Sequence, residues 1–173
     1  NTLIDKICLH YLGIHYPDSQ SNDFRKVVGN DETVWEAPGY EIPTVSLSRA
    51  PYPQYHTSMD DEGIVLEEKL EESVNVLFGI INIFETNSCL NRKFDGLIAL
   101  SNLKYNLYLK PGTDPAMHEE RTEEKSKWNY LMDCLPRYFD GNHSILEIAV
   151  KHNLPYEKVY SYVCKFAEKG LID

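Results

Sequence analysis

Apolar residues recur at helical spacing in two segments of the first half of the chain. In residues 3–12 they return every three or four positions, behind Thr2, whose side chain suits a helix cap, and before Gly13, which suits a helix end. Residues 66–87 form the longer segment. Its apolar face holds Leu70, Val74, Leu77, Phe78, Ile81 and Phe84. The spacing predicts a short first helix and a long amphipathic helix.

One strand is predicted between these helices. Residues 42–48 have the sequence Ile-Pro-Thr-Val-Ser-Leu-Ser, and Gly39 and Pro43 mark the start of the segment. Its near-continuous apolar character is typical of a strand that is covered on both faces. The order helix, loop, strand, loop, helix predicts that residues 1–90 form one edge of a mixed α/β sandwich.

The pattern changes after Asn91. Residues 97–109 contain two short β-like stretches, residues 111–115 form a turn-rich break, and residues 119–125 are a charged run that is typical of a solvated linker. The connector between the predicted α/β portion and the C-terminal part is therefore expected to contain little regular structure apart from short strands.

Three helices are predicted from Lys127 onwards. Apolar residues between Trp128 and Leu135 mark the first, Ser144 caps the second, and the third begins at Pro155 and ends before residue 171. A tight turn between the second and third helices is typical of a helix-turn-helix. The predicted domains are an α/β portion, a β-containing connector with a charged linker, and a winged-helix domain: residues 1–92, 93–124 and 125–173.

Composition limits the class of protein. A length of 173 residues allows one or two domains, and a hydrophobic content of 42% is that of a globular protein. No apolar run approaches the roughly 18–20 residues of a membrane span, and no signal peptide is expected. Because the first residue is Asn1 and not Met, the true N-terminus is expected to lie upstream. The four cysteines form no Cys-x-x-Cys pair, which favours a reduced, cytoplasmic protein.

The net charge of −10 is unevenly distributed along the chain. Residues 125–173 hold seven Lys and Arg against six Asp and Glu, whereas residues 1–124 hold ten against twenty-one. An acidic body argues against nucleic acid as the main partner, because phosphate binding needs a positive surface. Acidity alone identifies no substrate.

Candidate chemistry is concentrated in residues 52–61, which follow the predicted strand. Loops at the carboxyl ends of strands are where open α/β sheets bind ligands. This loop offers the imidazole of His56, the phenol of Tyr55 and the carboxylate of Asp60. A neutral imidazole is a good zinc ligand, and a carboxylate commonly holds its second ring nitrogen. The alternative is a surface histidine that is capped by its neighbours.

Residues 55–60, with the sequence Tyr-His-Thr-Ser-Met-Asp, resemble the Tyr-His-Thr-x-x-Asp loop of the two-zinc aminopeptidase family. Upstream, residues 29–43 resemble the segment of that family in which Ser-Asp-His is followed by Gly-(Ile/Val)-Pro and a buried strand. Here Asn-Asp-Glu replaces Ser-Asp-His, so that Glu32 stands where the family has histidine.

A bacterial branch of aminopeptidase-like proteins, often encoded near polysaccharide-biosynthesis genes, is similar over a larger part of the chain. Its members carry a Pro-x-x-Ser-Leu-x-Arg strand, here residues 43–49, and then a (Glu/Gln)-Tyr-His-Thr-Ser-x-Asp loop, here residues 54–60. They end in a winged helix with a Gly-x-His-Ser-(Ile/Leu)-x-(Glu/Asp)-Ile-Ala motif, here residues 141–149.

The resemblance implies a zinc-dependent hydrolase that cleaves an amide bond in a small peptide or an aminoacylated metabolite through metal-bound water. It implies that His56 is a ligand of one of two zinc ions and that the catalytic Tyr55 stabilises the oxyanion. Four further residues are expected in the second shell or the substrate cleft: Asp31, Glu32, Arg49 and Asp60. For each there is a local alternative, such as a polar turn before a strand or, for Arg49, a salt bridge within the acidic body.

A two-metal site needs about five His, Asp or Glu ligands and a Glu that activates water. In the family the remaining ligands precede the point at which this sequence starts, so the chain alone is expected to be inactive. The other histidines are expected to be structural or exposed. The alternative function is a non-enzymatic winged-helix adaptor or regulator with a degenerate peptidase-like domain. The expected partner is a small peptide-like substrate, and no membrane is expected as a partner. A homo-oligomer, or a protein partner that binds through the winged helix, is the further expectation.

Overall fold

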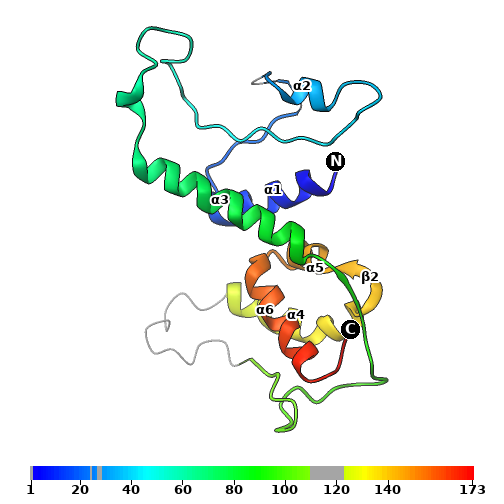
Figure 1. Ribbon diagram of the computed structural model, residues 1–173. Coiled ribbons are helices and arrows are strands. Elements are labelled where there is room, and N and C mark those ends of the chain that lie inside the picture. The colour runs from blue at the N-terminus through cyan, green and yellow to red at the C-terminus, as the bar shows by residue number, and fades with distance from the viewer. Residues whose placement is uncertain (1, 24, 27–28, 110–122) are drawn as a thin grey trace. The chain divides into compact units, whose positions relative to one another are not determined.

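The computed structural model describes residues 2–23, 25–26, 29–109 and 123–173. The chain divides into two compact units, Asn1–Glu85 and Thr86–Asp173 (Figure 1). The described residues are mostly helical, with a single two-stranded antiparallel sheet in the second unit. The described residues do not show the predicted α/β sandwich. Among the described residues, no helix is both long enough and apolar enough to cross a membrane.

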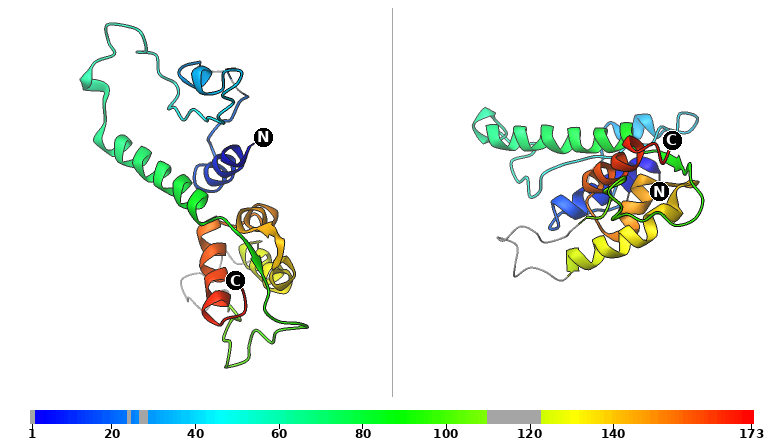
Figure 2. Two further views of the ribbon diagram at one scale, coloured as in Figure 1. Left: turned by 45° about the vertical axis from the view of Figure 1, so that its right-hand side comes forward. Right: turned by 90° about the horizontal axis from the view of Figure 1, so that it is seen from below.

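Two helices form the body of the first unit, α1 (Leu3–His15) and α3 (Glu67–Thr86). Both confirm the predicted helices, although α1 continues through Gly13. At the start of α1 the Thr2 backbone nitrogen donates to Asp5 Oδ2 at 2.6 Å, in a capping box. Gly79 of α3 lies against the ring of Tyr11, where a Cβ atom would come within 2.3 Å of ring carbon. A glycine therefore permits the close approach of the two helices, which lie side by side (Figures 1 and 2).

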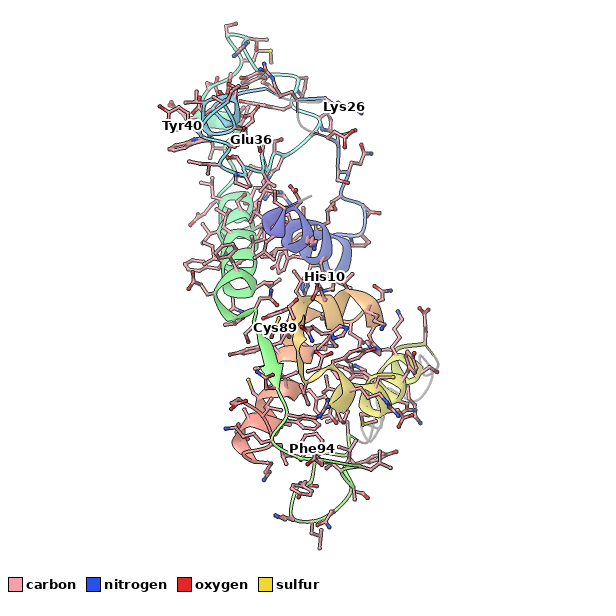
Figure 3. The ribbon with its side chains drawn as sticks, turned by 90° about the vertical axis from the view of Figure 1, so that its right-hand side faces the viewer. His10, Lys26, Glu36, Tyr40, Cys89 and Phe94 are labelled. Carbon is pink, nitrogen blue, oxygen red and sulfur yellow. The ribbon has the colours of Figure 1, made fainter. Side chains whose placement is uncertain are left out.

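The predicted interior strand 42–48 is wrong for this chain. The segment is extended, but it pairs with no other strand in the described part of the chain, and Ile42 and Leu47 are 46% and 42% exposed. A strand becomes interior only when neighbouring strands take up its backbone hydrogen bonds, and the described residues offer no such neighbour. The segment is instead held locally to α2 (Glu32–Trp35), because the Thr44 nitrogen donates to Glu36 Oε1 at 3.0 Å. Figure 3 labels Glu36 near this segment.

The long amphipathic helix is present, but its predicted apolar face is not buried by the described residues. The six side chains of that face are between 48% and 67% exposed. The side chains that α3 buries are those of Ile80 and Ile83, on the adjacent side of the helix. Hydrophobic periodicity identifies a helix and an apolar stripe, whereas which part of the stripe is covered depends on the neighbours.

The second unit contains the three helices predicted for the C-terminal part. They are α4 (Glu123–Tyr138), α5 (Ile145–His152) and α6 (Tyr156–Glu168). Ser144 caps α5 as predicted, since its Oγ accepts from the Glu147 nitrogen at 3.2 Å. Asn153 ends α5 with a left-handed backbone (φ 49°), and only two residues separate it from α6. Local capping signals thus fix the tight turn between α5 and α6.

A small sheet completes the second unit. Strand β1 (Cys89–Asn91) pairs antiparallel with β2 (Asp140–Ser144). The Asn91 nitrogen donates to the Asp173 carbonyl oxygen at 3.0 Å, and the Lys93 nitrogen donates to that of Leu171 at 2.8 Å. In an extended chain, alternate backbone N–H groups point in opposite directions. The β1 segment therefore binds β2 along one edge and the last residues of the chain along the other.

The core of the second unit is larger than that of the first. Its aromatic centre joins Phe139 to Phe166 at 5.2 Å and Phe166 to Tyr162 at 5.4 Å between ring centroids. The three helices and the turn between α5 and α6 also bury aliphatic side chains: Leu131, Leu135, Ile145, Leu146, Ile148, Leu154 and Val159. Burial of these side chains is the main source of stability for this unit.

The division of the chain differs from the predicted boundaries at 92 and 124. Since β1 pairs with β2, the second unit begins at Thr86, and it includes residues 93–109 of the predicted connector. Leu107 is buried, and its carbonyl oxygen accepts from the Tyr162 hydroxyl at 2.9 Å. In place of the two expected β-like stretches in residues 97–109, residues 100–105 form turns and the remaining residues have no regular secondary structure. The predicted break at 111–115 and most of the charged run lie outside the described residues.

Candidate functional site

The candidate site is the loop of residues 50–61, called here the His56 loop, in the first unit. It consists of successive tight turns. The Thr57 nitrogen donates to the Gln54 carbonyl oxygen at 3.0 Å, and the Thr57 hydroxyl donates to the same oxygen at 2.7 Å. The Asp60 nitrogen then donates to the Thr57 carbonyl oxygen at 3.2 Å. Short polar side chains that bind nearby backbone groups favour this loop conformation.

Three rings follow one another along the His56 loop. The centroids of Tyr52 and Tyr55 are 5.5 Å apart, and the His56 ring stacks on Tyr55 at 3.9 Å with an interplanar angle of 22°. The backbone of His56 is left-handed, with φ of 60°. No hydrogen bond or ion pair engages the His56 ring nitrogens within the described ranges of the chain. The loop therefore presents an imidazole whose ring position is set by stacking.

Asp60 binds Tyr52 rather than His56. The Tyr52 hydroxyl donates to Asp60 Oδ1, and this hydrogen bond raises the pKa of Tyr52. The expectation for Asp60 was a contact with either the loop or the second ring nitrogen of His56, and the structure shows the contact with the loop. Tyr52 was not among the predicted site residues. Nothing in the spacing of residues 52 and 60 distinguishes this pair from other polar pairs of the loop.

Arg49, the residue directly before the His56 loop, contacts α3. Its Nη1 lies 2.8 Å from Glu72 Oε2. Its Nη2 donates to the Lys69 carbonyl oxygen at 2.9 Å and to Ser73 Oγ at 3.0 Å. Of the two roles considered from the sequence, the structure shows the salt bridge.

Asp31 and Glu32 lie at the start of α2 and serve local structure. Glu32 is only 7% exposed, and its Oε1 accepts from the Asn30 nitrogen at 2.7 Å. Asp31 is exposed, and its carbonyl oxygen accepts from the Val34 nitrogen at 2.9 Å. Neither carboxylate has a hydrogen bond or ion pair with the His56 loop in the described part of the chain. The structure therefore does not join these two residues to Tyr55 and His56.

The described residues do not form a metal centre by themselves. They contain no group of three or more His, Cys, Asp or Glu side chains that could hold a metal ion. A zinc site in a protein normally has three or four protein ligands. His56 could supply one such ligand, so the group implied by the resemblance does not fit the described residues alone.

A second set of polar residues lies in the second unit. His152 is 4% exposed, and its Nε2 lies 3.1 Å from the Tyr138 hydroxyl. Nearby, His143 Nδ1 lies 3.0 Å from Asp140 Oδ1, and hydrogen bonds from Asn142 and His143 lower the pKa of Asp140 to about 2. Tyr138 lies between the two histidine rings, at 5.2 Å from that of His143 and 5.6 Å from that of His152. These histidines are integrated into the packing of the unit.

The described part of the second unit has two hollows on its surface. One, of about 430 Å³, is lined by residues that include Phe94, Met132 and Arg137, and the other, of about 320 Å³, by residues that include Trp128 and Lys158. Phe94 is labelled in Figure 3. Neither hollow contains a residue of the His56 loop, so neither bears on the candidate chemistry.

Comparison with known proteins gives a family and a fold. The family model described as "Domain of unknown function (DUF4910)" matches residues 1–87. A solved structure from Clostridium acetobutylicum, described as a "putative peptidase", matches with a TM-score of 0.67 and 21% sequence identity over 100% of this chain. The chain covers 36% of the clostridial protein, so it spans about a third of its length. None of the curated proteins matches the chain. At this identity the likeness shows the fold.

Proposed function

The chain belongs to the family described as "Domain of unknown function (DUF4910)", and from that premise we propose that it is one part of a metal-dependent, aminopeptidase-like hydrolase. The observation that carries the proposal is the fold match over the whole chain to part of the clostridial protein. The proposed reaction is cleavage of an amide bond in a small peptide or an aminoacylated metabolite, and the proposed metal is zinc.

The His56 loop is the proposed contribution of this chain to the active site. His56 would supply one metal ligand, and Tyr55 would donate a hydrogen bond to the oxyanion of the tetrahedral intermediate. Two observations support these roles. The His56 ring nitrogens have no hydrogen-bond partner among the described residues, and the ring is oriented by its stacking on Tyr55. Because the described residues hold no complete metal centre, no catalytic step is assigned to this chain alone.

The exposed apolar stripe of α3 supports the proposal that the first unit belongs to a larger domain. Six large apolar side chains on one helix face are more than an isolated surface helix normally exposes. The extended segment 42–48 is similarly unpaired among the described residues. We propose that the face and the segment pack against the part of a peptidase-like protein that has no counterpart in this chain.

The second unit is proposed to be a winged helix that contacts protein. Three helices, a tight turn between α5 and α6, and a small antiparallel sheet agree with that architecture. The exposed side of α6 carries no arginine, and its Lys158 is paired with Glu124 at 2.9 Å. A surface of this kind suits a protein partner or a second copy of the chain better than DNA.

Metal analysis of a longer protein that contains this chain tests the hydrolase proposal. We expect His56→Ala to lose about one of two bound zinc ions and most hydrolysis, and to keep its fold because the loop lies at the surface. The matched control is His15→Ala, a histidine on α1 and outside the His56 loop. If wild type and His56→Ala bind zinc equally, His56 is no ligand and the adaptor function becomes the better proposal.

A further inference from the structure

Both terminal nitrogens of the Arg49 guanidinium bind α3. The guanidinium contacts the Glu72 carboxylate, the Lys69 carbonyl oxygen and the Ser73 hydroxyl, all within 3.0 Å. The planar fork of arginine makes such simultaneous contacts directional, whereas a lysine ammonium acts as a point charge. The residue directly before the His56 loop is thereby attached to the first two turns of α3.

The other end of the His56 loop leads into the same helix. Asp61 Oδ1 accepts from the Gly63 nitrogen at 2.8 Å at the start of η1 (Glu62–Ile64), and α3 begins at Glu67. The start of the His56 loop is therefore bound to α3 through Arg49, and its end continues through η1 into the same helix, so that the Arg49 contacts close the loop. A contact that closes such a loop lowers the number of conformations available to it.

Contacts inside the loop determine its conformation, whereas the Arg49 contacts determine its position relative to α3. Tyr52 binds Asp60 across the loop, and the turn at residues 54–57 is closed by Thr57. Neither of these internal contacts reaches α3. Arg49 is, among the described residues, the side chain that links the start of the loop to the helix through hydrogen bonds.

Glu72 is suited to hold Arg49 at neutral pH. Its pKa is lowered, first by the hydrogen bond from Lys69 and also by the charge of Arg49. Lys69 Nζ lies 3.1 Å from the same carboxylate oxygen, but within the described part of the chain its ammonium makes no hydrogen bond or ion pair with the His56 loop. Glu72 thus has two cationic partners, of which only Arg49 adjoins the loop.

We propose that Arg49 is a positioning residue, which holds the Tyr55–His56 pair relative to α3 through Glu72 and Ser73. In this role it acts through its contacts with α3. Its relevance to catalysis rests on the proposed function, whereas the contact itself is a property of this chain. Because exposed ion pairs contribute little to the free energy of unfolding, the effect of losing Arg49 should be on loop motion rather than on folding.

Backbone ¹⁵N relaxation of the 173-residue chain tests the proposal. In Arg49→Gln, order parameters in residues 50–61 should fall from the wild-type level to below about 0.6, while α3 stays near the 0.85 of a rigid backbone. Lys69→Gln is the matched control, because it removes an ion pair from Glu72 and leaves the loop contact in place. Its loop order parameters should equal those of wild type. Arg49→Lys should lie between the two, since it restores the charge without the fork.

Two results would overturn the positioning role. One is a loop equally ordered in wild type and Arg49→Gln, which would mean that the internal contacts suffice. The other is a parallel loss of order in α3, which would make Arg49 a structural residue of the whole unit. Because the measurement uses no metal or substrate, its failure is independent of the outcome of the zinc experiment.

Discussion

His152 combines deep burial with incomplete hydrogen bonding. Its Nε2 contacts the Tyr138 hydroxyl at 3.1 Å, whereas its Nδ1 has no partner within the residues that the structure describes. Burial, and then the charge of Lys151, lower its pKa below the usual value of 6.5. A buried histidine of this kind is neutral in the folded protein at neutral pH. It therefore makes the stability of the second unit depend on pH.

The stability of the second unit should fall as pH decreases below about 6.5. Because the pKa of His152 is lower in the folded state, the unfolded chain binds the proton at a higher pH than the folded chain does. The stability that neutral His152 contributes is therefore lost as pH falls toward its folded-state pKa. Urea unfolding between pH 7.5 and pH 5 measures the free energy of unfolding, and in His152→Gln this free energy should decrease less steeply with falling pH than in wild type. His56→Gln, an exposed histidine, is the control and should follow wild type. Equal slopes in all three proteins would contradict the prediction.

At the scale of the element, α3 has two apolar surfaces with different surroundings. Ile83 is 2% exposed within the first unit, whereas Ile81, two positions earlier, is 53% exposed. The two residues are chemically identical and lie in the same turn of one helix. Their substitution therefore separates burial from helix propensity.

Ile83→Ser should destabilise the first unit by about 2–4 kcal/mol, because it leaves a cavity and a buried hydroxyl. Ile81→Ser should change the free energy of unfolding of the 173-residue chain by less than about 0.5 kcal/mol. Thermal unfolding of both variants checks the difference. In a longer peptidase-like protein, Ile81→Ser should also destabilise, since the proposal places this face in a core. A neutral Ile81→Ser in that protein would contradict the proposed packing.

At the scale of the whole molecule, acidity is concentrated in residues 1–124, and residues 125–173 are close to neutral. Nucleic-acid binding depends on neutralising phosphates with several Lys and Arg side chains. Of the lysines on α6, Lys158 already pairs with Glu124. Neither the charge of the chain nor this surface favours DNA.

The complete chain should show no salt-dependent, submicromolar binding to duplex DNA. The physical reason is the net charge of −10 together with the absence of arginine from the whole of α6. A mobility-shift titration at low salt measures it. Since the acidic first unit could mask a binding second unit, Glu124→Gln, which releases Lys158, is the informative variant and should also fail to bind. Tight binding that weakens with added salt would overturn the prediction of a protein-contacting module.

The sequence by itself determined the helices, because their apolar periods and caps are local properties. The helix of residues 66–87 and the Ser144 cap of α5 are examples. It also located the His56 loop as the place of candidate chemistry. Only the tertiary structure decided that residues 42–48 are unpaired among the described residues and that α3 leaves its main apolar stripe exposed. A salt bridge of Arg49 within the acidic body was one of the alternatives from the sequence, but only the structure identified Glu72 as its partner. Pairing, burial and ion pairs join residues that are distant in sequence, and no local pattern specifies which partner is present.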